Sequence, residues 1–253
     1  MDQKEEGKGK SGDPPKVRIA VPAVDSVITT GLSNTLTHWT HSPELLVEAP
    51  QFYQKCVPHD HCRNLIVKEF LEETDYSYLC MVDDDIIPPV DGLQRLVAAK
   101  KMAICAMCYC FKQNPEVLGG LPMPAALGMF TNPEIPGGYI CDPHHRGVTL
   151  VDSMNGGCFL VHREALESIE PPWFKFRFDE QGLRTGGEDT YFSEKLNAAG
   201  IRTFCDYDIH CGHRSEVDVL DMIQVMAHLK SSAEQPAPTD SEPLPSPESV
   251  LPG

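Results

Sequence analysis

Residues 78–86 read Tyr78-Leu79-Cys80-Met81-Val82-Asp83-Asp84-Asp85-Ile86, a short apolar run followed directly by three acids. The run predicts a buried strand, with the acids emerging together at its carboxyl end, where open α/β sheets bind ligands. Because side chains alternate along a strand, Asp83 and Asp85 are expected to point to one side and Asp84 to the other. Two carboxylates about 4 Å apart repel by roughly 4 kcal/mol at an effective dielectric of about 20, which a divalent cation would relieve. An ordinary acidic turn leading into Pro88-Pro89 is the alternative.

The regions around this stretch alternate between strand and helix patterns. Apolar runs predict strands at 17–21, 103–110, 157–161 and 201–205, the first of them broken at Pro22. Helical spacing predicts helices at 63–73, from about 91, at 163–169 and at 188–199, the last ending at Gly200. This alternation is typical of an α/β protein with a mainly parallel central sheet flanked by helices. An apolar stripe on a closing helix is interpreted as core packing and consists of Met222, Val225, Met226 and Leu229.

Domain organisation follows from composition. Residues 1–14 and 231–253 are predicted to be disordered tails, the second acidic and rich in Pro and Ser. Residues 15–230 are expected to form a single domain. Within it, the segment 112–148 is rich in Pro and Gly with little periodicity, which predicts a binding loop or lid.

The composition also argues against some functions and suggests a compartment. A net charge of −16 argues against general nucleic-acid binding, because phosphate backbones attract Lys and Arg. Neither a signal peptide pattern nor a run of about 18 apolar residues is present, so no transmembrane segment is expected. The ten cysteines are therefore expected to be reduced, in a cytoplasmic protein. A zinc site at Cys105, Cys108 and Cys110 is an alternative, but their apolar surroundings favour core packing.

Two segments on either side of the acidic run are candidates for ligand contact. Arg63-Asn64 opens a predicted helix, and the guanidinium could reach a phosphate or a nucleotide base, although a surface arginine is equally compatible. Asn155-Gly156-Gly157 precedes a predicted strand. A glycine pair there lets the backbone approach a ligand closely, or it simply forms a turn.

Two later segments carry groups suited to catalysis or metal binding. Glu188 and Asp189 stand in the first turn of a predicted helix, either as acids stabilised by the helix dipole or as a general base. His210 and His213 follow the last predicted strand, and either imidazole could complete a metal site with the acids of the triplet. A purely structural histidine is the alternative.

In chain order, these segments resemble the GT-A glycosyltransferases, especially small family-2-like members. The resemblance covers about residues 17–215 and rests on Arg63-Asn64, Asp83-Asp84-Asp85-Ile86-Ile87-Pro88-Pro89, Pro172-Trp173-Phe174, Gly187-Glu188-Asp189-Thr190-Tyr191-Phe192 and Cys211-Gly212-His213.

The resemblance implies a divalent cation, Mn²⁺ or Mg²⁺, bound by the D-x-D acids Asp83 and Asp85 and by His213, with His210 as the other possibility. It implies Asp189 as the catalytic base, with Glu188 as the alternative. The donor would be a nucleotide-sugar, UDP- or GDP-linked, and Pro22-Ala23-Val24-Asp25 matches the place where the family holds the base. Lys112 stands where an arginine-type residue is expected. The residues expected to bind the nucleotide-sugar are Pro22, Asp25, Arg63, Asp83, Asp84, Gly156 and Gly157.

The predicted function is a metal-dependent glycosyltransferase that moves a hexosyl-type sugar from a nucleotide-sugar to an acceptor that the sequence does not identify. Oxygen ligands with at most one imidazole suit Mn²⁺ or Mg²⁺ better than zinc. No dinucleotide or P-loop glycine motif is present. A nucleotidyltransferase is the first alternative, although residues 22–31 lack the glycine-rich basic loop expected there. A catalytically silent nucleotide-sugar-binding module is the second.

Overall fold

The computed structural model describes residues 14–24, 27–113, 122–126, 130–131, 139–140 and 146–214. The chain divides into two compact units, residues 1–111 with 124–215 and residues 112–123 with 216–253, and the first contains everything discussed below. Asp25, the closing helix predicted around 222–229, and the predicted tails apart from Pro14 lie outside the described residues. The domain boundaries at 15 and 230 therefore stay a prediction.

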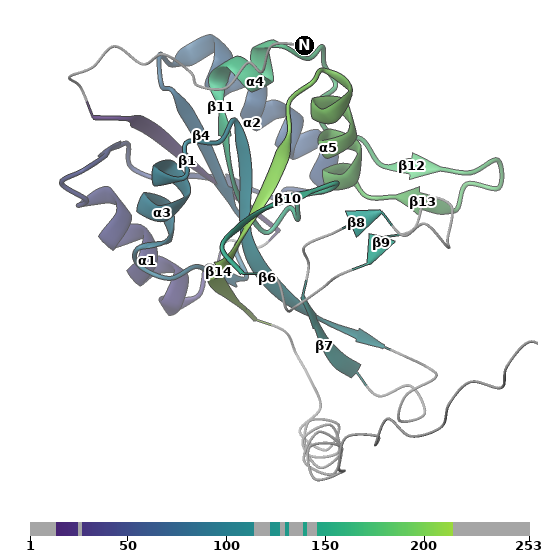
Figure 1. Cartoon of the computed structure of the whole chain (residues 1–253), viewed down its shortest axis with the longest axis horizontal. Coiled ribbons are helices and arrows are strands. Elements are labelled where there is room, and N and C mark those ends of the chain that lie inside the picture. The colour runs from purple at the N-terminus through teal and green to yellow at the C-terminus, as the bar shows by residue number, and fades with distance from the viewer. Residues whose placement is uncertain are drawn as a thin grey trace, which may run out of the picture. The chain divides into compact units, whose positions relative to one another are not determined.

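A central, mainly parallel sheet forms the first unit, as the sequence predicts (Figure 1). Its strand order is β10 (Val148–Val151), β14 (Thr203–His213), β6 (Ala103–Gln113), β11 (Cys158–His162), β4 (Tyr78–Val82), β1 (Lys16–Ala23) and β2 (Leu46–Val47). Two strands are reversed, since β11 is antiparallel to β4 and β6, and β10 is antiparallel to β14. Short strands add to it: β3 (Gln51–Gln54) is parallel to β1, and β5 (Ile86–Ile87) is antiparallel to β14. The remaining strands are β7 (Pro122–Ala126), β8 (Phe130–Thr131), β9 (Tyr139–Ile140), β12 (Arg177–Phe178) and β13 (Arg184–Gly186).

Helices cover both faces of the sheet. On one face lie α1 (Thr30–Thr40) and α3 (Gly92–Ala98), and on the other lie α2 (His59–Glu73), α4 (Arg163–Glu167) and α5 (Glu188–Ala198) (Figure 1). Side-chain alternation along β4 feeds both layers: Leu79 and Met81 pack into the core under α2, whereas Cys80 and Val82 pack into the core under α1 and α3. Among the described residues, no helix has the length and apolar character needed to cross a bilayer.

Local patterns locate β4 and α5 well but misplace other boundaries. β4 has the predicted bounds, and Gly200 closes α5 with a φ of +80°. The first strand is not broken at Pro22; beyond Ala20 it pairs only with β3, and a proline is tolerated where one side of a strand is unpaired. α2 begins at His59, so Arg63 lies in its second turn and does not open it.

The last strand is longer than predicted. β14 does not end at 205 but continues through His210 and His213, after a register shift against β6 between Asp206 and His210. The irregular register hides the strand pattern in the sequence, so the two histidines lie within the strand and do not follow it.

The prediction that all cysteines are reduced is wrong for two of them. Cys56 and Cys62 form a disulfide, because the loop between β3 and α2 folds back and brings their Cα atoms to 5.3 Å. Such bonds are typical of oxidising compartments, so the cytoplasmic assignment stays a prediction that this feature does not favour. The other cysteines with described side chains are free and buried: Cys80, Cys105, Cys108, Cys158, Cys205 and Cys211.

The carboxyl end of α2 is closed by a side chain from another element. Arg163, the first residue of α4, donates to the backbone carbonyls of Phe70, Leu71, Thr74 and Tyr76 at 2.8 to 3.3 Å. The last carbonyls of a helix have no partner within the helix, so Arg163 supplies what the chain itself leaves open.

Replacing Arg163 with methionine is expected to lower the free energy of unfolding by roughly 2–4 kcal/mol, because several carbonyls lose a charged donor. Denaturant unfolding followed by circular dichroism measures this loss. The matched control, Lys68→Met on the exposed side of the same helix, is expected to stay within about 0.5 kcal/mol of the wild type. Equal losses in both variants would show that Arg163 does not secure α2.

Candidate active site

Strand direction brings the predicted site residues to one edge of the sheet. Parallel β1, β4 and β14 end at this edge, and reversed β11 begins there, so the acidic triplet, the glycine pair and His213 converge. They line a cleft of about 350 Å³. The predicted residues in its wall are Pro22, Arg63, Asp83, Asp84, Asp85, Gly156, Gly157, Glu188, Asp189 and His213, joined by Val24, His59, Ile86, Cys108 and Asn155.

The three acids of the triplet each have a different partner. Residues 83–85 have left β4 and form a turn, so the expected alternation of Asp83 and Asp85 against Asp84 is wrong. Asp83 pairs with Arg63. Asp84 Oδ2 accepts a hydrogen bond of 3.0 Å from the backbone N–H of Val24, and this bond ties the turn to the end of β1. Asp85 Oδ2 lies 3.1 Å from His213 Nε2.

Arg63 is a buried link and not an exposed ligand contact. Its side chain is 2% exposed, and Nη2 donates to both carboxylate oxygens of Asp83, at 2.8 and 3.1 Å. Its Nε lies 3.6 Å from Glu188 Oε1. The rings of Phe159 and Phe174 flank the guanidinium, with ring centres 5.7 and 5.9 Å away. The predicted contact of Arg63 with a phosphate or base is therefore not supported by its placement.

The pKa of the Asp83 carboxyl is raised from 3.8 to about 7. Burial is the largest cause, because a charged carboxylate is poorly solvated there. The guanidinium of Arg63 opposes this shift, while the neighbouring acids Asp85, Glu188 and Asp84 add to it. Asp83 is thus partly protonated near neutral pH.

His213 is held in one tautomer. Its Nδ1 lies 2.6 Å from the backbone carbonyl of Tyr109, which can only accept, so Nδ1 carries a proton. In the neutral ring, Nε2 then presents a lone pair to Asp85 Oδ2, itself an acceptor. Two acceptors at this distance need a proton or a cation between them. His210, the other candidate, instead contacts the hydroxyl of Tyr109 at 2.6 Å through Nδ1.

The two acids at the start of α5 differ in their surroundings. Glu188 is buried and lies within 3.6 Å of both Arg63 and Arg184. Asp189 is half-buried, and its Oδ1 accepts the backbone N–H of Thr190 at 2.8 Å. A Cβ on Gly187 would meet Asp189 Oδ1, so a side chain there would require this carboxylate to move.

The glycine pair before β11 makes room for protein side chains. A Cβ on Gly156 would lie 3.0 Å from Arg63 Nη2, and one on Gly157 would lie 3.1 Å from Cys108 Sγ. Both glycines also line the cleft, so their predicted contact with a nucleotide-sugar stays a prediction.

Sequence reasoning missed one polar residue in the cleft wall. His59 is the first residue of α2, and no local pattern distinguishes it from a surface histidine. Asn155 belongs to the predicted ligand-contact segment, but its structural role is new: its side chain donates to the carbonyl of Ala106 at 2.7 Å and accepts from Gly157 N–H at 3.2 Å, which fixes the start of β11.

The predicted three-residue metal site is not assembled. Within the described part of the chain, no group of three or more His, Cys, Asp or Glu side chains is arranged to hold an ion. The pair of Asp85 and His213 is in place, whereas Asp83 is turned towards Arg63.

The fold and the cleft define an α/β protein with an acid-lined site at the carboxyl edge of a mainly parallel sheet. No family model matches the chain, and no curated protein matches it. Among solved structures, it is similar to A197 from STIV, with a TM-score of 0.48, 16% identity and coverage of 80% of this chain and 86% of that one. It is also similar to GalNAc-T7 solved with UDP, GalNAc and Mn²⁺, with a TM-score of 0.45, 11% identity and coverage of 87% and 48%. Similarities at this level carry no functional conclusion.

Asp83 is expected to make stability fall as the pH rises. The folded carboxyl keeps its proton up to about pH 7, whereas the unfolded one loses it near 3.8, so the folded state binds more protons in between. Between about pH 4 and 7, the free energy of unfolding of the wild type should fall by on the order of 3–4 kcal/mol relative to that of Asp83→Asn. Above about pH 7 this difference should change little.

Denaturant unfolding across this pH range measures the difference. Glu72→Gln, at an exposed position of α2, serves as the control and should follow the wild-type curve. A pH-independent difference between wild type and Asp83→Asn would show that the Asp83 proton is not linked to folding.

Proposed function

We propose that this chain is a metal-dependent glycosyltransferase of the GT-A class that transfers a hexosyl group from a UDP- or GDP-sugar to an acceptor hydroxyl. One observation carries the proposal: His213 Nε2 lies 3.1 Å from Asp85 Oδ2, while its Nδ1 lies 2.6 Å from the Tyr109 carbonyl, so the ring is oriented with Nε2 towards the carboxylate. A histidine whose second nitrogen donates to a backbone carbonyl has the arrangement usual for a metal ligand. The family-2-like subdivision stays a prediction.

The charge of the cleft also favours a cation. Five carboxylates line it, from Asp83, Asp84, Asp85, Glu188 and Asp189, against the single guanidinium of Arg63. A nucleoside diphosphate would be repelled by this wall unless a divalent ion offset the charge. Carboxylate oxygens with one imidazole suit Mn²⁺ or Mg²⁺.

Two residues are proposed as the metal ligands. Asp85 and His213 would hold the ion, and Asp83 could join them only by leaving Arg63. When bound, such an ion supplies Lewis-acid stabilisation of the negative charge on the departing diphosphate.

Asp189 is the better candidate for the catalytic base. In an inverting transfer, this carboxylate would accept the proton of the acceptor hydroxyl as the new bond forms. Glu188 is engaged by Arg63 and Arg184, so it is less suited to accept a proton and better suited to fix the start of α5. Pro22 and Val24 lie where the nucleotide base is proposed to bind, at the end of β1 that Asp84 secures.

Asp85→Ala is expected to abolish Mn²⁺-dependent hydrolysis of UDP- and GDP-hexoses, at least roughly a hundredfold, while the fold is retained. A panel of nucleotide-sugars assayed with Mn²⁺, with Mg²⁺ and with EDTA measures this. Asp208→Ala, at an exposed position of β14, is the control and should keep full activity. Activity that survives EDTA, or that survives in Asp85→Ala, would overturn the proposal. Binding of UDP or GDP with Mn²⁺ but no turnover with any donor would instead support a silent binding module.

Asp189→Asn is expected to lose transfer by roughly two to four orders of magnitude yet to bind nucleoside diphosphate with Mn²⁺ as tightly as the wild type. Calorimetry and a transfer assay separate the two effects. Glu188→Gln, the neighbouring acid, should instead lower stability, because it weakens the contact with buried Arg63. Loss of nucleotide binding in Asp189→Asn would contradict its role as base.

A further inference from the structure

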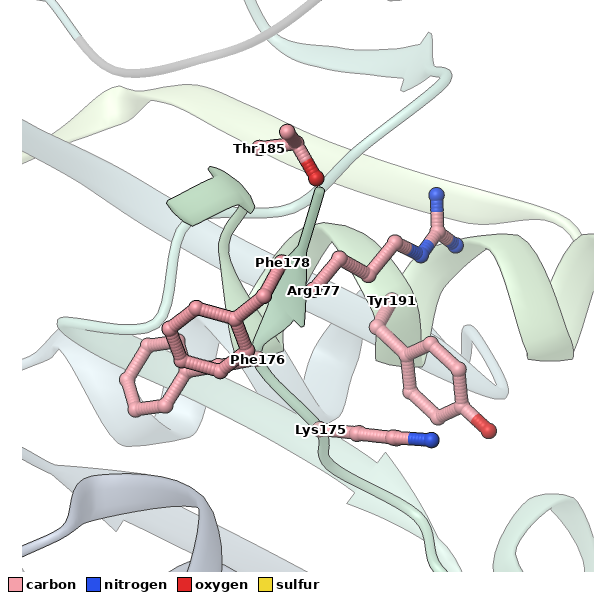
Figure 2. A pocket seen from close by; sticks show the side chains of 6 residues that line it. All are labelled: Lys175, Phe176, Arg177, Phe178, Thr185 and Tyr191. Atoms are coloured by element: carbon pink, nitrogen blue, oxygen red, sulfur yellow. The ribbon is translucent and has the colours of Figure 1, made fainter. Parts of the chain in front are cut away.

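A second pocket, of about 500 Å³, lies beside the start of α5. It is lined by Lys175, Phe176, Arg177, Phe178, Thr185 and Tyr191 (Figure 2). These side chains come from the segment entering β12, from the β12–β13 hairpin and from α5. We propose that this pocket binds the acceptor, and that the acceptor is a sugar that carries an anionic group. This inference rests on the proposed transferase function for the word acceptor, but the binding itself does not require it.

Aromatic rings supply the surface for a sugar. Phe176, Phe178 and Tyr191 line the pocket, and Phe178 is 61% exposed. An exposed aromatic face beside polar groups is typical of a ligand site, because it buries the apolar C–H face of a sugar ring while hydroxyl groups bond to the rim. The hydroxyls of Thr185 and Tyr191 are available in the lining for such bonds.

The charge of the pocket indicates an anionic ligand. Its lining contains two cations, Lys175 and Arg177, and no acid, in a chain whose net charge is −16. Arg177 is held by Glu194 and lies 5.4 Å from the centre of the Tyr191 ring. Lys175 is exposed, and no hydrogen bond or ion pair joins its ammonium to another described residue. Lys175 is therefore the group that can pair with a carboxylate or phosphate on the ligand.

Arg184 contacts one lining residue of the pocket and one of the cleft. Its guanidinium lies 4.0 Å from the centre of the Phe176 ring and 3.5 Å from Glu188 Oε2. Glu188 and Tyr191 are three residues apart on α5 and share one face of the helix. A ligand in the pocket is thereby next to the turn of α5 that carries Asp189.

The segment that leads into the pocket is anchored by hydrogen bonds, which favours a preformed site. Asn64 on α2 accepts from the backbone N–H groups of Trp173 and Phe174, at 2.8 and 3.1 Å, and donates to the Phe174 carbonyl at 2.7 Å. Asp60 accepts from Phe176 N–H at 3.3 Å. The segment that presents Lys175 and Phe176 is thus fixed to a helix of the core.

The test measures dissociation constants of three sugars by NMR titration of the full chain without nucleotide or metal: methyl β-D-glucuronide, glucose 6-phosphate and neutral methyl β-D-glucoside. At least one anionic sugar is expected to bind roughly tenfold or more tightly than the glucoside, as a charge-assisted contact would give. The carboxylate and phosphate arms show which anion the pocket takes. In Lys175→Gln the preference for the anionic sugar should fall to about twofold or less, and in Phe178→Ala all binding should weaken by about fivefold or more.

Two matched controls separate the pocket from the general surface. Lys68→Gln removes an exposed cation of α2, and Phe52→Ala removes an aromatic ring of β3 that is 46% exposed; both should bind as the wild type does. Equal affinity for charged and neutral sugars, or equal losses in the controls, would overturn the proposal that this pocket binds an anionic sugar.

The outcomes for the two proposals can be told apart. If the anionic preference holds in Asp85→Ala while the wild type hydrolyses no nucleotide-sugar, the binding proposal is supported and the transferase proposal is contradicted. If the wild type hydrolyses a nucleotide-sugar but shows no preference for anionic sugars, only the binding proposal is contradicted.

Discussion

One buried guanidinium holds the candidate site together. Arg63, reaching from the second turn of α2, bonds Asp83 at the end of β4 and lies against Glu188 at the start of α5. Without Arg63, the acids Asp83 and Glu188 would face each other in a poorly solvated place with no cation between them. Three elements that are distant in the sequence are therefore fixed relative to one another at the point where the acidic turn and the proposed base meet. The glycine at 156 is part of the same arrangement, since a side chain there would meet Arg63 Nη2.

Patterns within one element predicted much of the fold, and they selected site candidates that lie near one another in the structure. The apolar run of β4, the helix of α5 with its closing glycine, and the alternation of strand and helix are local signals, and the structure bears them out. The residues predicted to bind a metal or a nucleotide-sugar and the two candidate bases line one cleft, apart from Asp25, which is not described, and the alternative ligand His210. Strand direction explains this, because it places the ends of separate strands at one edge.

What the sequence did not predict depends on contacts between distant elements. Burial decides that Arg63 faces Asp83 and not solvent, and it also raises the pKa of Asp83. No local pattern in the sequence reveals this burial. The length of β14 depends on a shift in its pairing with β6, and the Cys56–Cys62 bond depends on how the loop between them folds back. The sequence singled out Arg63-Asn64 as a motif but did not predict the structural role of Asn64, which anchors the segment at Trp173 by hydrogen bonds.

The orientation of His213 depends on a main-chain atom. Its Nδ1 proton is received by the carbonyl of residue 109, a group that every amino acid provides, whereas the Tyr109 side chain contacts His210 instead. A substitution at position 109 therefore leaves the acceptor of the imidazole proton in place, because any residue there supplies the same carbonyl, whereas a substitution at position 213 removes the ring itself. The tautomer of His213 is thus set by the path of the backbone and not by the identity of the neighbouring side chain.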